Sequence, residues 1–592
     1  MPGSTPEPAT SRRPGTRPDC RERYDVAVLG AGPAGLAGAV HAAELGLCVA
    51  LLDSSGQPGG QYYRHPPPAA RAARPEALHH DWQVFADLRD RLASSGATQL
   101  FGHDVWTITR AAEDDWTVHA LADENDPNCP TEQGRRPVTV RARAILLATG
   151  SYERHLPFPG WTLPGVVGAG GAQAMLKSGL VLPGRRVVVA GSGPLLLAVA
   201  ASLTSAGAQV PELIEASGYL GYARRPDVLA AQTGKLTEAV RHGAALLRHG
   251  VRLRTRHAVT EAHGTDRVEA VTVTRLDRDW RPVPGTDRRI ACDALAVGHS
   301  LIPQIDLATA LGCATRRTAD GTHALELGPL QETSLRGMWS AGETSGVGGA
   351  QLAVAEGTLA GLAIAARLTG RLPATASRPR ARSDMRALRA LRSLRRSRDR
   401  MRAFADVMAA AHAPGPGWPG WLSDDTDVCR CEEVSAGRVR EAVREYGARD
   451  ARTVKLLTRA GMGWCQGRMC GSAVACLVAS ATPRTEAFTS APTSDDPLPA
   501  EAEAEARGEA EAEAGDAPAP APAPDRRLLA TPVPLATLAA LPETPGAPPQ
   551  DPSPHETPYE APYEAPHATY TPAPYDPPTP TSPPHPTEGQ PS

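Results

Sequence analysis

Two stretches of the chain share one alternation of apolar runs, glycine turns and alanine-rich segments. The first begins with a buried-strand pattern from Tyr24 to Leu29 and continues through a glycine-rich turn, a helix ending near Glu44 and a second strand, Cys48 to Leu52. The same texture returns from Arg186. Strands that alternate with helices in this way are typical of a doubly wound parallel sheet. The pattern therefore predicts an α/β fold with two Rossmann-like dinucleotide-binding domains.

Outside these two stretches the pattern changes. Between residues 371 and 421, apolar side chains recur at spacings of three, four or seven among arginines, which predicts an amphipathic connector helix with a solvated basic face. Residues 1–22 and 481–592 are rich in proline or alternate Glu with Ala, and we expect them to be disordered tails. The apolar positions of the connector are Met385, Leu388, Leu391, Leu394, Met401, Phe404 and Met408.

Length and composition narrow the class of protein. A chain of 592 residues is too long to fold around a single hydrophobic core, so several domains are expected. The net charge of -3 gives no reason to expect nucleic acid as a partner, and no apolar run approaches the roughly 18 residues of a membrane span. With a Pro- and Arg-rich N-terminus, these features predict a cytoplasmic protein without a membrane span. Ten cysteines in so long a chain form no dense disulfide framework.

The first glycine turn has every part of a dinucleotide fingerprint. In Gly30-Ala31-Gly32-Pro33-Ala34-Gly35, the first glycine permits a tight turn, the second lets backbone approach a pyrophosphate, and the third lets the helix pack closely on the strand. The helix N-terminus then faces the anion. Asp53, at the end of the following strand, can accept hydrogen bonds from ribose hydroxyls. This complete set predicts a nucleotide site.

The second glycine turn repeats the architecture with one departure. Gly191 and Gly193 follow a strand, and Glu215 ends the next strand, where it would favour NAD over NADP. Leu196 replaces the third glycine. Three occupants remain open for this domain: NAD(H), another adenine nucleotide in a structural role, or none.

Four cysteines cluster in two pairs after the second domain. Cys429 and Cys431 are followed, after 33 residues, by Cys465 and Cys470. Four thiolates can hold a [2Fe-2S] cluster, and the glycines around the second pair let backbone N–H groups approach the sulfurs. Structural zinc is the alternative, although a CxC pair fits the usual zinc spacing poorly.

Two further segments resemble the signatures of the glutathione reductase and thioredoxin reductase superfamily. They are a strand that ends in Thr149-Gly150 and another that closes on Gly342-Glu343. The resemblance implies that FAD is the first cofactor, and that Gly60-Gln61 lies where such proteins bring backbone near the flavin ring. The paired cysteines that disulfide reductases of this superfamily use are missing, so dithiol chemistry is not expected.

The cysteine segment closely resembles the bacterioferritin-associated-ferredoxin-like (BFD-like) [2Fe-2S] domain. In particular it is similar to the version fused behind a flavoprotein in the large subunits of octopine and nopaline oxidases, hydrogen cyanide synthase and dye-linked proline or hydroxyproline dehydrogenases. The resemblance covers roughly residues 24 to 475. It implies that the cluster passes electrons between flavins, and that an amine- or amino-acid-oxidising flavoprotein subunit is the partner. A small ferredoxin-like subunit is a further candidate partner.

These interpretations divide the chain into seven segments. They are a tail (1–22), the FAD-binding domain (23–157 and 291–370), an inserted NAD-binding-like domain (158–290), a helical connector (371–421), a small helical [2Fe-2S] domain (422–480) and a second tail (481–592).

Three functions are consistent with this organisation. No acid, base or nucleophile is identifiable as catalytic, which favours an electron-transfer subunit of a heteromeric amino-acid or amine dehydrogenase or oxidase. The first alternative is a self-sufficient NAD(P)H-dependent FAD oxidoreductase that passes electrons through its cluster. The second is a non-enzymatic module that binds a nucleotide and zinc.

Overall fold

Strand β1 (Tyr24–Leu29) lies inside a seven-stranded sheet and is almost completely buried. The structure is a computed structural model that describes residues 23–123, 135–370, 382–481, 527, 529–539 and 541. The strand order is β3-β2-β1-β6-β5-β4, and β19 pairs with β6 as well. β5 runs antiparallel to both β4 and β6, and the other neighbours are parallel. The other strands are β2 (Val49–Asp53), β3 (Thr98–Phe101), β4 (His103–Ala112), β5 (Asp115–Ala122), β6 (Arg136–Leu147) and β19 (Met338–Ser340).

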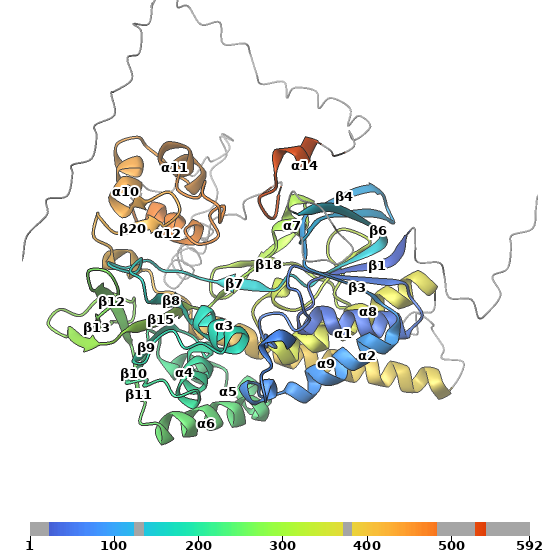
Figure 1. The fold of residues 1–592 in the computed structure, drawn as a ribbon, viewed down its shortest axis with the longest axis horizontal. Coiled ribbons are helices and arrows are strands. Elements are labelled where there is room, and N and C mark those ends of the chain that lie inside the picture. The colour runs from blue at the N-terminus through green and yellow to red at the C-terminus, as the bar shows by residue number, and fades with distance from the viewer. Residues whose placement is uncertain are drawn as a thin grey trace, which may run out of the picture. The chain divides into compact units, whose positions relative to one another are not determined.

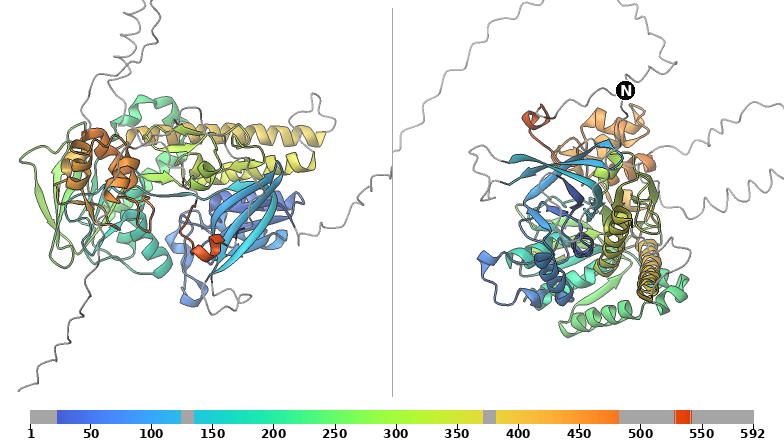
Figure 2. Two further views of the ribbon diagram at one scale, coloured as in Figure 1. Left: turned by 90° about the horizontal axis from the view of Figure 1, so that it is seen from above. Right: turned by 90° about the vertical axis from the view of Figure 1, so that its right-hand side faces the viewer.

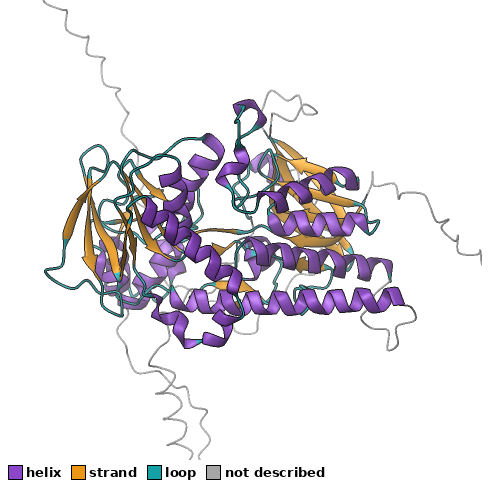
Figure 3. Ribbon diagram, turned by 90° about the horizontal axis from the view of Figure 1, so that it is seen from below, coloured by secondary structure: helices purple, strands orange, loops and turns teal. Residues whose placement is uncertain are grey.

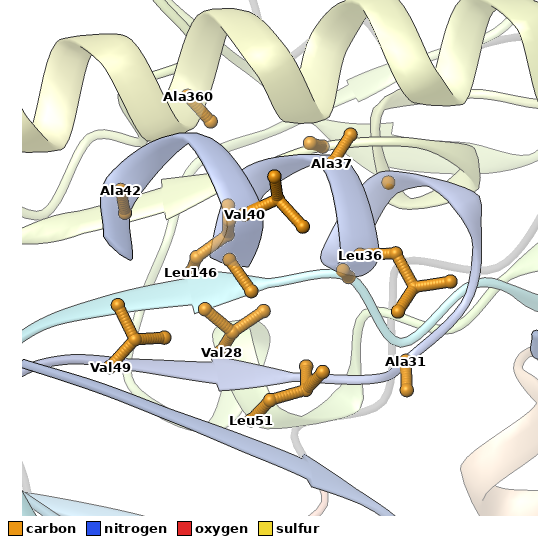
Figure 4. Close-up of a cluster of buried hydrophobic side chains, with 14 of the residues drawn as sticks. Val28, Ala31, Leu36, Ala37, Val40, Ala42, Val49, Leu51, Leu146 and Ala360 are labelled. Atoms are coloured by element: carbon orange, nitrogen blue, oxygen red, sulfur yellow. The ribbon is translucent and has the colours of Figure 1, made fainter. Parts of the chain in front are cut away.

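Helix α1 (Pro33–Glu44) packs between this sheet and helix α8 (Ala350–Thr369). In Figure 4, Val28, Leu51 and Leu146 of the strands lie beneath α1, and Ala360 of α8 lies above it. The two helices touch through backbone, because a Cβ added to Gly357 would lie only 2.0 Å from the carbonyl oxygen of Ala34. Glycine at this position therefore sets how closely α8 approaches the first glycine turn.

Among the described residues, α8 is the one helix long and apolar enough to cross a membrane by length and composition. The helix is not an uninterrupted apolar run, because Glu356 and Arg367 lie within it. Of its most apolar window, 67% is buried inside the protein, where it packs along α1 (Figure 4). Its small side chains serve helix packing here.

The second α/β domain is built on a parallel five-stranded sheet of order β11-β10-β9-β15-β8. An antiparallel sheet of three strands, β12-β13-β14, adjoins it (Figure 1). These two sheets bear out the prediction of a second Rossmann-like domain. Their strands are β8 (Val166–Gly168), β9 (Val187–Ser192), β10 (Glu212–Glu215), β11 (Arg252–Thr255), β12 (His257–His263), β13 (Ala270–Arg275), β14 (Arg288–Ala291) and β15 (Ala294–His299). Its helices are α3 (Ala169–Gly179), α4 (Leu195–Ser205), α5 (Pro226–Ala230) and α6 (Thr233–Arg248).

A short antiparallel pair, β7 (Ser151–Glu153) and β16 (Leu301–Pro303), carries the chain into the second domain and back (Figure 1). After β16 the chain completes the first domain through α7 (Asp306–Ala310), β17 (Thr315–Arg317) and β18 (His323–Leu325). Helix α2 (Trp82–Ser95) covers α1 from the other side.

The predicted connector is the long helix α9 (Arg382–Ala411), which runs beside α8 (Figure 2). Seen from below, it continues from the FAD-domain helices to the second domain (Figure 3). Near its end it packs against the 3-10 segment Tyr219–Arg224 of that domain.

The small cysteine domain is helical, as predicted, with one β hairpin. It packs on the second domain together with the end of the connector: Val428 and Val439 share one hydrophobic cluster with Trp280 and with Trp418 and Trp421 of the connector. The rings of Trp280 and Trp421 are 6.0 Å apart. The Trp161 indole of the second domain also donates to the Asp427 carbonyl at 2.6 Å. The elements of the small cysteine domain are β20 (Asp427–Cys429), β21 (Val434–Ser435), α10 (Ala436–Arg444), α11 (Ala451–Thr458) and α12 (Gly471–Ala481).

Part of the predicted C-terminal tail has a defined place. The described residues up to Pro534 form one compact unit, and those from Leu535 onward form a second that contains α14 (Leu535–Ala539). Within the first unit, Ala530 is buried and its N–H donates to the Trp106 carbonyl at 2.8 Å. These few described residues of the predicted tail therefore pack on the FAD-binding domain. The predicted tail 1–22 and most of 481–592 lie outside the described residues.

Candidate cofactor sites

The first glycine turn has the tight geometry that the fingerprint predicts. Gly30 has φ +103°, and an added Cβ would lie 2.2 Å from the Ala148 carbonyl oxygen. Gly59 donates its N–H to the Ala31 carbonyl at 2.9 Å, and Gly60 lies against Gly32. Helix α1 begins at Pro33 with no acidic residue in its first turn and no side-chain cap. Its free N–H groups and the cradle of glycines fit the pyrophosphate of a dinucleotide.

Asp53 lies at the carboxyl end of β2, beside this turn. Its two carboxylate oxygens accept hydrogen bonds from the backbone N–H groups of Ala31, at 2.6 Å, and Ser55, at 2.7 Å. Each oxygen keeps a further lone pair for a ribose hydroxyl. The predicted ribose-binding residue, Asp53, is thus held in place by backbone N–H groups. Ala34, another predicted residue of the fingerprint, lies in the first turn of α1.

The two later FAD signatures, Thr149-Gly150 and Gly342-Glu343, both lie beside the first glycine turn. Gly342, with φ +83°, lies next to Ala34, so the Gly342-Glu343 segment adjoins the first turn of α1. The Glu343 carboxylate accepts hydrogen bonds from the N–H groups of Gly348 at 3.2 Å and Gly349 at 2.9 Å, and burial raises its pKa. Thr149 donates its hydroxyl to the Gln304 carbonyl at 2.7 Å, and Gly150 accepts from the Gln304 N–H at 2.9 Å.

Arg402 is a residue of this site that sequence reasoning missed. It reaches from α9 into the loop after Gly342 and bonds to the Glu356 carboxylate at 2.6 Å and the Gly346 carbonyl at 2.6 Å. The other Glu356 oxygen accepts from the Gly342 N–H at 2.9 Å. Arg402 stands among many arginines of α9, and nothing in its spacing marks it as the one that bonds to Glu356.

The loop after Gly60 accepts a hydrogen bond from a buried lysine of the second domain. Gln61 is exposed and its amide oxygen accepts from Arg64 at 2.8 Å. The next residue, Tyr62, accepts at its carbonyl from the ammonium of Lys177 at 3.0 Å, and this lysine comes from α3 of the second domain. Lys177 is 6% exposed, and burial lowers its pKa to about 8.

The second glycine turn is formed as predicted but is covered by the chain itself. Gly191 has φ +134°, Gly193 has φ +115°, and the Leu196 side chain fills the core beneath the turn. The Glu215 carboxylate is completely buried and accepts from the N–H groups of Gly193 and Ser217, both at 3.0 Å.

His412, directly after α9, covers this acid. Its Nδ1 lies 3.4 Å from the Glu215 carboxylate, its Nε2 lies 3.1 Å from the Tyr222 hydroxyl, and its carbonyl accepts from Ser192 at 3.2 Å. Both His412 and Glu215 are at most 3% exposed. The residue that would bind a ribose therefore has its polar contacts made within the chain.

The four predicted cluster cysteines come together as two pairs. The sulfurs of Cys431 and Cys465 are 3.8 Å apart, and the Cys470 thiol bonds to Cys429, which holds the pKa of Cys429 at about 5. Metal–sulfur bonds of about 2.3 Å at tetrahedral angles also separate two sulfurs by roughly 3.8 Å. Cys429 and Cys470 are buried, whereas Cys431 is exposed.

Nearby glycines shape this site. Gly461 donates its N–H to the Cys429 sulfur at 3.4 Å, and a Cβ on Gly463 would lie 2.2 Å from the Cβ of Cys431. Among the described residues, no three His, Cys, Asp or Glu side chains surround one point as a single metal ion requires. Cys429, Cys431, Cys465 and Cys470 would hold a [2Fe-2S] cluster through their thiolates.

No redox-active cysteine pair adjoins the first glycine turn in the described part of the chain. Cys292 and Cys313 are free and buried, and burial raises the pKa of Cys292 to about 11. Cys48 is disulfide-bonded, but it precedes the amino end of β2, whereas Asp53 and the turn lie at the carboxyl end, about 15 Å away.

Comparison with known proteins defines the class. Residues 24–357 match the pyridine nucleotide-disulphide oxidoreductase family and residues 428–480 match the BFD-like [2Fe-2S] binding domain. The chain belongs to this oxidoreductase family and is an FAD-dependent flavoprotein with a [2Fe-2S] domain. The zinc-binding, non-enzymatic alternative was wrong.

Individual relatives are similar over most of the chain. The A subunit of the opine oxidase of Rhizobium meliloti is 35% identical over 462 residues, which cover 77% of this chain and 92% of the relative. Hydrogen cyanide synthase subunit HcnB of Pseudomonas aeruginosa is 33% identical over 454 residues, covering 75% and 90%. The crystal structure of L-proline dehydrogenase from P. horikoshii has the same fold, with a TM-score of 0.51, 21% identity and coverage of 80% and 78%.

Proposed function

We propose that this chain is the electron-transfer subunit of a heteromeric dehydrogenase or oxidase that acts on an amine or amino acid. Both relatives are named as subunits, one of an opine oxidase and one of hydrogen cyanide synthase. A partner flavoprotein would hold the substrate pocket. FAD exchanges electrons in pairs and the [2Fe-2S] cluster exchanges them singly, so this chain joins two-electron oxidation to one-electron transfer.

The observation that carries the proposal is the covered second nucleotide site. A nicotinamide nucleotide needs a ribose-binding carboxylate that it can reach, but Glu215 is completely buried, whereas Asp53 of the first site, which is bonded to backbone in the same way, is partly exposed. His412 lies over Glu215, so a nucleotide could enter only after the end of α9 moves away. Electrons are therefore not expected to arrive as hydride from NADH, which is the requirement of the self-sufficient alternative.

The test is an anaerobic titration of the purified holoprotein with NADH, following the flavin and iron-sulfur absorbance together. We expect both chromophores to stay oxidised with excess NADH and to bleach with dithionite. Stoichiometric bleaching by NADH would refute the proposal and favour the self-sufficient enzyme.

Two further measurements sharpen the result. His412→Ala should uncover Glu215, so a gain of NADH or ADP binding in this variant alone would show that His412 closes the site. Leu220→Ala is a control in the 3-10 segment Tyr219–Arg224 that His412 packs against, because Leu220 is exposed. The holoprotein mixed with its partner subunit should then oxidise an amine or amino acid with dye reduction, and neither protein should do so by itself.

A further inference from the structure

A short line of contacts joins the FAD signature to the cysteine loop. Thr149 and Gly150 both bond to the backbone of Gln304, at 2.7 and 2.9 Å. Two residues further on, Asp306 begins helix α7. Its Oδ2 accepts from the guanidinium of Arg468 at 2.7 Å, and Arg468 lies between Cys465 and Cys470 in the cluster-binding loop. The Asp306 carboxylate therefore lies between the two candidate cofactor sites.

A second arginine completes the arrangement from the far end of the sequence. Arg527 donates to Asp306 Oδ1 at 3.1 Å, so each carboxylate oxygen accepts from a different guanidinium. Arg527 also donates to the hydroxyl of Tyr152, two residues past Gly150, and burial raises the pKa of that tyrosine. The side chains of Asp306, Arg468 and Arg527 are 13%, 16% and 18% exposed. At such low exposure, charge-assisted hydrogen bonds fix geometry well.

The chain around Arg527 contacts both the FAD-binding domain and the small cysteine domain. Ala530 accepts at its carbonyl from Arg468 and donates its N–H to the Trp106 carbonyl of β4 at 2.8 Å. Ala530 itself is 4% exposed and belongs to a hydrophobic cluster of the FAD domain. We name the described residues Arg527, Leu529, Ala530 and Thr531 the strap. It lies outside both family matches, which end at residues 357 and 480.

We propose that Asp306 is the positioning residue that fixes the cluster-binding loop on the FAD domain, and that the strap holds it there. The step served is the movement of one electron between flavin and cluster, in which one group loses the electron that the other gains and no bond forms or breaks. The rate of this electron transfer falls steeply with the distance between flavin and cluster. A loop fixed in one position gives one distance and therefore one rate. This inference does not depend on the proposed partner subunit, because any route through both cofactors includes this step.

The experiment compares full-length holoprotein with three variants. Asp306→Asn removes the charge and keeps the shape, Arg527→Gln removes one of the two bonds, and Asp306→Glu restores the charge. Asp227→Asn is the matched control, since it breaks an Arg–Asp pair, Arg225–Asp227, that is well exposed. FAD and iron content, and the electron paramagnetic resonance signal of the reduced cluster, are measured first.

Two readouts then separate positioning from simple stability. Hydrogen exchange of residues 465–470 should become at least roughly tenfold faster in Asp306→Asn, by a smaller factor in Arg527→Gln, and should return towards wild type in Asp306→Glu. After flash reduction of the flavin, the cluster should be reduced more slowly and with several rates in Asp306→Asn. Asp227→Asn should match wild type in both.

The opposite results would overturn the proposal. Unchanged loop exchange together with an unchanged single rate of cluster reduction in Asp306→Asn would show that the carboxylate positions nothing. If Asp306→Asn loses its cofactors, Arg527→Gln becomes the test of the proposal. Hydrogen exchange of residues 465–470 and a rate of cluster reduction that both equal those of the wild type in Arg527→Gln would then overturn the role of the strap.

Discussion

Lys177 provides a prediction whose size and sign follow from burial. Its ammonium donates to the Tyr62 carbonyl at 3.0 Å and lies 5.4 Å from the centre of the Tyr62 ring. Among the described residues, no carboxylate forms an ion pair with it. Burial lowers the pKa of Lys177 from 10.5 to about 8. That difference corresponds to about 3 kcal/mol by which the charged lysine disfavours the folded state.

The sign follows from which state holds the proton. Below pH 8 the lysine is charged in the folded and the unfolded chain, so the full cost is present. Between pH 8 and 10.5 the folded protein releases this proton while the unfolded chain keeps it, so the free energy of unfolding rises with pH. We expect a gain of about 2 kcal/mol between roughly pH 7 and 9.5. Tyr63, whose pKa burial raises to about 12, opposes this trend only above about pH 10, where the unfolded tyrosine ionises.

The assay is urea unfolding of wild type, Lys177→Met and Lys177→Arg at several pH values, followed by tryptophan fluorescence. At pH 7, Lys177→Met should be more stable by about 1 to 2 kcal/mol, since relief of the buried charge exceeds the lost hydrogen bond. This advantage should vanish near pH 9.5. Lys177→Arg stays charged throughout, so its difference in stability from Lys177→Met should stay constant with pH. A difference between wild type and Lys177→Met that is constant from pH 7 to 9.5 would refute the reasoning.

The remaining predictions concern the two cofactor sites and the helix beside them. Cys465→Ser should lose the cluster and keep FAD, because the two family matches do not overlap; iron analysis and flavin absorbance test this, and loss of both cofactors would contradict it. Gly30→Ala should abolish FAD retention on gel filtration, because its Cβ would lie 2.2 Å from the Ala148 carbonyl oxygen. Gly357→Ala should cost about 1 to 3 kcal/mol and lower the melting temperature, because its Cβ would lie 2.0 Å from the Ala34 carbonyl oxygen. Gly243→Ala, in helix α6 with open space around it, should instead stabilise by up to about 1 kcal/mol, and equal melting temperatures for these two variants would contradict the packing argument.

The sequence predicted best what depends on neighbouring residues. The Gly30 turn, its strand and its helix follow one another directly, and the periodicity of α9 predicted that helix without any partner in view. The [2Fe-2S] domain was found from the spacing and surroundings of four cysteines.

The contacts that sequence reasoning missed join positions far apart in the chain. Arg402 meets Glu356, His412 meets Glu215 and Arg527 meets Asp306, with 46 to 221 residues between partners. Each involves a polar residue of a common type in a segment that looks ordinary locally. Only the packing of α9 on α8, and of the strap on β4, brings them together, and no local pattern encodes that packing.

Helix α9 reaches both nucleotide sites, so a movement of this helix would link them thermodynamically. Arg402 bonds into the loop after Gly342, and ten residues later His412 closes the second site, about 15 Å further along the same axis. If displacement of His412 also shifted α9, that shift would disturb the contacts of Arg402. By reciprocity, FAD bound at the first site would then strengthen the closure of the second, and loss of FAD would weaken it.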